Sequence, residues 1–108
     1  MRDPGRWLDA RRPAAPAPLR AVLERALEGA PAADAAVEER LADAALATLR
    51  QLARHPGGRE SAPALLAADA LLTYACEAAA ERGPAALEAL TSGLSPERFD
   101  SLLEEGAS

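Results

Sequence analysis

The sequence predicts an all-α fold, a compact bundle of four to five helices with a proline- and arginine-rich N-terminal arm. Alanine and leucine supply most of the apolar residues, and both favour helix. Residues that favour strands are scarce, because the chain has no isoleucine, only two valines and 3% aromatic residues. Glycine and proline separate the apolar stretches and mark where helices begin and end. The length of 108 residues suits one domain.

Residues 1–17 are expected to form an arm, flexible or docked, ahead of a single helical domain over residues 18–106. Three prolines and a glycine oppose a continuous helix there, although one turn could form between Trp7 and Arg12. Trp7 and Leu8 are an apolar pair that is costly to expose to water. We therefore expect the arm to dock, and on its own domain rather than on another chain.

Two helices are predicted next, over residues 18–28 and 34–55. The first carries apolar side chains at i, i+3 and i+4 spacing and ends at Gly29. The second has Asp34 as a candidate N-cap, with Glu38 near the positive end of the helix dipole. Its apolar face comprises Val37, Leu41, Ala44, Ala45, Thr48, Leu49 and Leu52.

The longest apolar helical pattern spans residues 61–82, and we expect this helix to lie at the centre of the bundle. Ser61 can cap its start, and Gly83 with Pro84 ends it. Leu66 projects into the polar arc, where we expect either a neighbouring helix or a partner to cover it, and Tyr74 lies at the edge of the apolar face. The apolar face is expected to contain Leu65, Ala68, Leu71, Leu72, Ala75, Cys76, Ala78 and Ala79, and the narrow polar stripe Asp69, Thr73, Glu77 and Glu81.

Two shorter helices are predicted over residues 84–92 and 95–105, each with a proline in its first turn. The short loop at 55–61 makes the helices 34–55 and 61–82 antiparallel neighbours. A core this rich in alanine buries little area per residue, so pairing with a second copy is a plausible source of further stability.

Charge is divided unevenly along the chain, whose net charge is −5. The segment through Arg20 holds five arginines against two aspartates (net +3), and the remainder holds seven arginines against fifteen acids (net −8). A single cysteine cannot form an internal disulfide, and no apolar run approaches the ~20 residues of a membrane span. We expect a cytoplasmic protein without membrane contact.

No group of residues matches a catalytic, metal or cofactor site, so we expect no enzyme activity and no cofactor. Cys76 lies late in an apolar helix, where a structural thiol explains it better than a nucleophile. His55 follows a helix end next to Pro56 and has no nucleophile partner in the pattern. The acidic pairs on the helices lack the Glu-x-x-His spacing of bundle metal sites, and Gly57-Gly58-Arg59 alone is weak evidence for phosphate binding.

The alternative function is that of a regulator associated with nucleic acid, in contact with phosphate through the arm. It would use five arginines together with Trp7 as a stacking group, namely Arg2, Arg6, Arg11, Arg12 and Arg20. The acidic remainder of the chain would repel phosphate at close range. The helix 61–82 also carries acids instead of the exposed basic and amide groups of a recognition helix.

The leading expectation is a small non-enzymatic helical protein that acts through protein–protein contacts. A homodimer is one assembly that such contacts could form. Its partner is a protein or a second copy of the chain, and nucleic acid is the less expected partner. The candidate interface holds the larger apolar groups that the helical pattern leaves off the main core face, or that lie outside the predicted helices. They are Trp7, Leu8, Leu66 and Tyr74.

Overall fold

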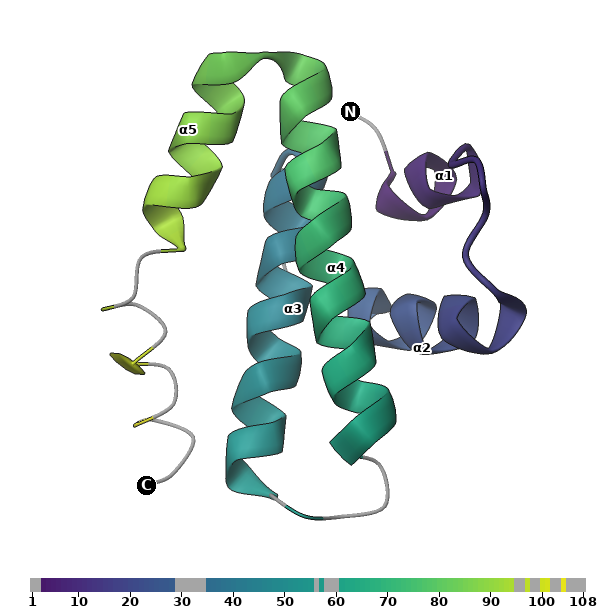
Figure 1. Cartoon of the computed structure of the whole chain (residues 1–108), viewed down its shortest axis with the longest axis vertical. Coiled ribbons are helices and arrows are strands. Elements are labelled where there is room, and N and C mark those ends of the chain that lie inside the picture. Colours follow the sequence, from purple (N-terminus) through teal and green to yellow (C-terminus); the bar gives the residue numbers. More distant parts are fainter. Residues whose placement is uncertain are drawn as a thin grey trace.

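The computed structural model shows an all-α compact bundle, as the sequence predicts. It describes residues 3–28, 35–55, 57 and 61–94, and residues 97, 100, 101 and 104 singly. Within this part of the chain there are five helices and no strand (Figure 1). The helices are α1 (Pro4–Asp9), α2 (Ala17–Glu28), α3 (Val37–Arg54), α4 (Ser61–Arg82) and α5 (Pro84–Gly93).

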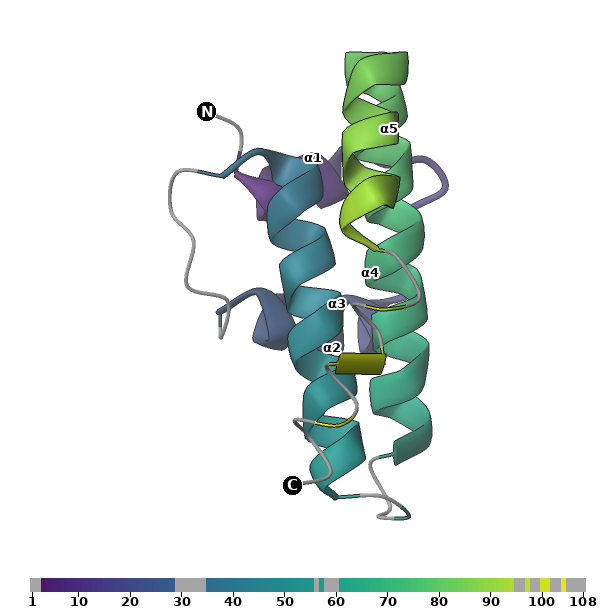
Figure 2. The ribbon, with the colours of Figure 1, turned by 90° about the vertical axis from the view of Figure 1, so that its left-hand side faces the viewer.

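The antiparallel pair α3 and α4 forms the centre of the fold. The two helices run side by side along most of their length (Figures 1 and 2). The buried residues of α4 are mostly alanines, and small side chains at a contact let two helix axes approach closely. Helices α1 and α2 lie on one side of the pair, where α2 runs across it, and α5 lies on the other side.

The connection between α4 and α5 depends on Gly83. Its φ of +126° is rarely adopted by residues with a Cβ, and Pro84 then opens α5 at a position where no N–H is needed. The chain therefore reverses sharply, and α5 packs back on α4 with Leu90 buried. Both α4 and the start of α5 occur where the glycine and proline signals predict them.

Helix α1 differs from the expected single turn at residues 7–12, since it already begins at Pro4. The Asp3 side chain accepts a hydrogen bond from the backbone N–H of Gly5 at 3.1 Å, which caps the helix. Pro4 takes the first helical position and so favours the helix instead of opposing it. The signal for this short helix was the Asp3-Pro4 pair.

Two other predicted helix boundaries differ from the structure or lie outside the described residues. Helix α3 begins at Val37 instead of residue 34, with Ala36 at the N-cap position, and the proposed cap Asp34 lies outside the described residues. The predicted helix 95–105 also lies largely outside them, although its four described residues are helical.

The buried face of α4 is rotated from the predicted one. It is centred on Leu71 and Ala75, while Leu65, predicted to be in the core, is 57% exposed. The reason is that α3 packs against the alanine-rich side of α4, so the bulkier Leu65 lies at the edge of that contact. The polar stripe from Asp69 to Glu81 is exposed as predicted.

Candidate functional site

The N-terminal arm is docked on its own chain, and its anchor is Trp7. Trp7 and Leu8 are each 4% exposed and belong to the main hydrophobic core. The indole Nε1 of Trp7 donates a hydrogen bond to Glu81 Oε1 at 2.8 Å. Its ring meets that of Tyr74 edge-on, with the centroids 6.0 Å apart. A tryptophan and a tyrosine far apart in sequence are thus brought together on α4.

Three of the four predicted interface residues therefore lie in one place and face their own chain. Trp7 and Leu8 are within the core, and Tyr74 packs against that core. Their role as contacts to another molecule stays a prediction, but the two arm residues have almost no exposed surface left for it. Leu66, the fourth residue, lies eight positions before Tyr74, about 12 Å away along α4.

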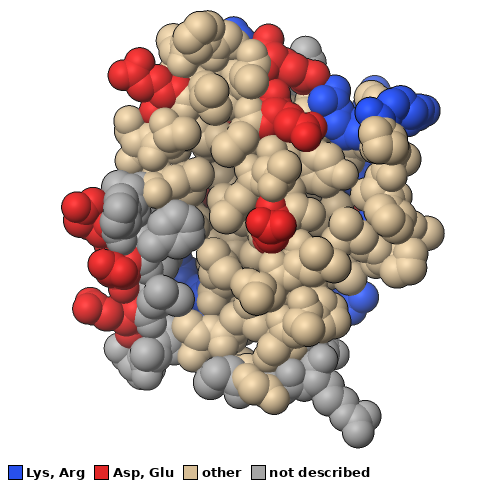
Figure 3. Space-filling model, viewed as in Figure 1, with Lys and Arg blue, Asp and Glu red and all other residues tan. Residues whose placement is uncertain are grey.

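Arginines of the arm reinforce the docking. The guanidinium of Arg11 lies over the Trp7 ring, 4.1 Å from its centroid, and also donates to Glu81 Oε2 at 2.7 Å. Arg20 donates to the backbone oxygen of Gly5 at 2.9 Å and to Asp9 Oδ1 at 2.8 Å. These charges are neutralised within the chain, which makes them less available to phosphate. In Figure 3 basic and acidic groups lie side by side at the upper edge, near α1.

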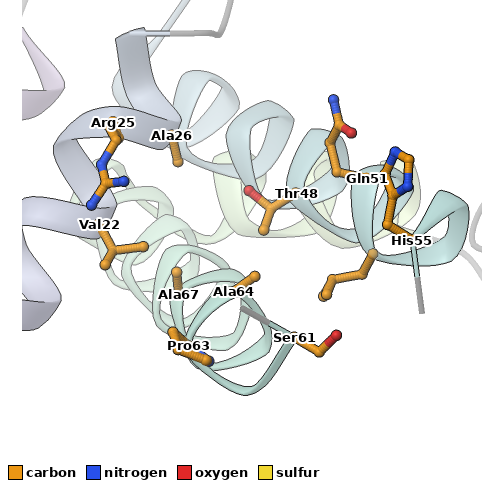
Figure 4. Close-up of a pocket in the computed structure, with 11 residues that line it drawn as sticks. Val22, Arg25, Ala26, Thr48, Gln51, His55, Ser61, Pro63, Ala64 and Ala67 are labelled. Atoms are coloured by element: carbon orange, nitrogen blue, oxygen red, sulfur yellow. The ribbon is translucent and has the colours of Figure 1, made fainter. Parts of the chain in front are cut away.

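A groove of about 830 Å³ opens elsewhere, between α2, α3 and the first half of α4 (Figure 4). Apolar side chains form most of its walls, mainly short ones from α2 and α4, with Leu52 from α3. Its lining residues are Val22, Arg25 and Ala26 from α2, Thr48, Gln51, Leu52 and His55 from α3 and its C-cap, and Ser61, Pro63, Ala64 and Ala67 from α4.

The polar groups of the groove carry no negative charge. Arg25 lies at one end and His55 at the other, and both are exposed (Figure 4). None of the described lining residues is acidic, although the chain has 17 acidic residues against 12 basic ones. The Thr48 hydroxyl is already used, since it donates to the backbone oxygen of Ala44 at 2.8 Å.

Two adjacent leucines near the start of α4 are unusually exposed. Leu65 is 57% and Leu66 58% exposed, and they are the exposed large hydrophobic residues of the described part of the chain. Neither leucine lines the groove. At about 100° per residue, both lie on the side of α4 opposite Ala64 and Ala67, so they form a separate apolar patch.

No family model, curated protein or solved structure matches this chain.

A second, smaller cavity of about 290 Å³ lies between the start of α3 and α5. Glu38 is 3% exposed there and pairs with Arg82, which is itself largely exposed. The other carboxylate oxygen, Oε1, is buried without a hydrogen-bond partner among the described residues. The position in the first turn of α3 also favours this negative charge. This arrangement ties the end of α4 to the start of α3.

The candidates for reactive chemistry do not assemble into a site in the described residues. Cys76 is a half-buried free thiol that does not line the groove. His55 does line the groove, so the thiol and the imidazole do not share a site. The described residues contain no group of three or more histidines, cysteines and acids placed to hold a metal ion. Among them, too, no helix has the length and apolar character needed to cross a bilayer.

Sequence patterns missed the groove because its walls come from three helices that no motif connects. One signal was available: Thr48 lies on the apolar face of its helix, where a hydroxyl is unusual in a fully packed core. Arg25 gave no signal, since an isolated arginine on a short helix is ordinary.

Proposed function

We propose that this chain is a non-enzymatic cytoplasmic protein that acts through protein–protein contacts, with Leu65 and Leu66 at the centre of its contact surface. The observation that supports this most directly is the pair of adjacent leucines, each more than half exposed. Single exposed leucines are common, but two adjacent leucines that are both exposed form an apolar patch, which is typical of interaction sites.

The surroundings of the leucines support a contact surface of useful size. In Figure 3 the face over α4 is largely uncharged below the arm, with a single acidic group near its centre. Interface centres are depleted in charged residues, while their rims are polar. The exposed leucines would supply the anchors of such a contact.

A second copy of the chain is one partner that this surface could accept. The core is built largely from alanines, which bury little area, so a shared apolar surface would add stability. A homodimer through the α4 leucines is the simplest such assembly, because the same patch would meet itself around a two-fold axis.

The test compares the wild-type chain with the double variant Leu65→Glu/Leu66→Glu. Its matched control, Ala47→Glu/Ala80→Glu, adds the same charge at two exposed helix positions that do not line the groove. We expect the leucine variant to lose self-association in sedimentation, or to lose specific partners in affinity capture, while the control retains them. Circular dichroism checks that both remain folded.

The proposal fails if the wild-type chain is a monomer at high concentration and no captured protein depends on the two leucines. The nucleic-acid alternative has weaker support, because Arg11 and Arg20 are paired with carboxylates of their own chain. It would need binding to nucleic acid that falls steeply as salt rises. The absence of binding in low salt would remove it.

A further inference from the structure

We propose that the groove between α2, α3 and α4 receives an amphipathic helix of a partner protein whose apolar stripe is flanked by carboxylates. This inference rests on the proposed function and names the chemistry of the partner. It combines the shape of the groove with the distribution of charge around it.

The shape favours a helix face over a small ligand. A volume of about 830 Å³ is within the ordinary range of ligand pockets, but this groove is open to solvent along one side. A small molecule is usually enclosed on most of its surface, whereas a helix presents one stripe and leaves the opposite face in water.

The lining has the depth for side chains at helical spacing. Alanines from two helices, Ala26, Ala64 and Ala67, leave room between the backbones of α2 and α4 (Figure 4). Larger aliphatic side chains from a partner at i, i+3, i+4 and i+7 would fill that room, as in other helix-in-groove complexes. Burial of those side chains would supply most of the affinity.

The charges determine which amphipathic helix fits. Arg20 on α2 is paired with Asp9 and Glu24, whereas Arg25 has no ion pair with any residue that the structure describes. Arg25 is therefore available to a carboxylate of the partner at one end of the groove. His55 offers a second donor at the other end, and no acid of the described lining would repel the partner.

Long-range electrostatics predicts the opposite preference, which makes the inference easy to test. A chain with net charge −5 attracts a basic peptide and repels an acidic one at a distance. Tighter binding of the acidic peptide would therefore have to come from the local charges of the groove.

The experiment uses the full chain and two synthetic helical peptides of about 18 residues, which is five turns. Both carry the same leucine stripe, flanked by glutamates in one and by lysines in the other. Fluorescence anisotropy of the labelled peptides measures their binding. We expect the glutamate peptide to bind at least about tenfold more tightly, since a close ion pair can contribute that much.

Three variants locate the binding. Arg25→Glu, at an exposed position, should reverse the preference between the two peptides, and Ala64→Phe should weaken both by filling the groove. Arg6→Glu makes the same charge change on α1 at another exposed position and should leave the preference unchanged. Circular dichroism identifies any variant that fails to fold. If Ala64→Phe fails to fold, Arg25→Glu still tests the inference.

The inference is overturned if neither peptide binds, if the lysine peptide binds more tightly, or if Arg25→Glu leaves the preference unchanged. Loss of a dimer in Arg25→Glu and Ala64→Phe, without peptide binding, would show a second copy as the occupant and would also overturn it. These outcomes can be told apart from failure of the proposed function. Partners that depend on Leu65 and Leu66 would remain even if the acidic peptide did not bind.

Discussion

At the scale of single residues, Trp7 unites the arm with the rest of the molecule. A buried tryptophan removes about 150–250 Å² from water, an upper estimate of roughly 4–6 kcal/mol at 25 cal/mol per Å². Glu81 accepts from both the indole and Arg11, so one carboxylate aligns the ring and the cation above it. Tyr74 packs edge-on against the same ring.

Substitution of Trp7 separates these contributions. Trp7→Ala should lower the free energy of unfolding by about 3–5 kcal/mol, because it removes a large buried side chain. Trp7→Phe should lower the free energy of unfolding by less than Trp7→Ala does. About 1–2 kcal/mol of that decrease should come from the missing hydrogen-bond donor to Glu81. Urea unfolding followed by circular dichroism measures both. Glu88→Gln, at an exposed position of α5, is the control, and equal stability of all three variants would contradict the packing.

Glu38 and Arg82 form an ion pair between the start of α3 and the end of α4. Arg82→Met leaves the Glu38 carboxylate buried without its cation, so we expect a loss of about 1–3 kcal/mol in the free energy of unfolding. The loss should lie toward the low end, because Arg82 is more than half exposed.

The double variant Glu38→Gln/Arg82→Met should regain part of that stability, since the unpaired charge is then gone. Thermal or urea unfolding measures the coupling in a double-mutant cycle. Arg54→Met, at the exposed end of α3, serves as the control. If Arg82→Met left the free energy of unfolding unchanged, the ion pair would contribute nothing to stability.

At the scale of elements, α1 illustrates a helix that depends on its docking site. Six residues are too few to be stable as an isolated helix, because nucleation costs more than so short a ladder of hydrogen bonds returns. The cap at Asp3 and the proline at the first position lower that cost, and burial of Trp7 and Leu8 provides the rest.

Removal of residues 1–15 should therefore weaken the whole bundle. We expect the shortened chain to keep most of its helical signal but to unfold at a lower temperature and to bind a hydrophobic dye, because the site under Trp7 is uncovered. A peptide of residues 1–15 should show little helix and the fluorescence of a solvated tryptophan. If the shortened chain were as stable as the full one, the arm would not be an integral part of the fold.

At the scale of the whole molecule, the bundle combines a net negative charge with an exposed apolar edge. Two copies with charge −5 repel one another, while the α4 leucines favour contact. Salt screens the repulsion more than it affects apolar burial.

Self-association, where sedimentation detects it, should therefore increase from low to high ionic strength. The same increase should be absent from Leu65→Glu/Leu66→Glu and present in Ala47→Glu/Ala80→Glu. Association that weakens with salt would instead indicate charge pairing between copies, through a surface other than the leucines.

The helix ends show how far local chemistry reaches. Ser61–Arg82 has the bounds that the sequence predicts, because glycine and proline act on the backbone within one turn. The cap of α1 obeys the same local rules, although a helix beginning at Pro4 was not predicted. The exposed polar stripe of α4 and its off-pattern Leu66 were also predictable, since both follow from 3.6 residues per turn.

The sequence by itself thus determined an all-α fold, the ends of its longest helix and the position of Leu66 off the apolar face. Only the tertiary structure decided that Leu65 is exposed, that Trp7 meets Glu81, and that Arg25 and His55 border one groove. The physical reason is range. Propensity and capping act between near neighbours in the chain, whereas these contacts join residues as far apart as 74 positions and exist only once the helices pack.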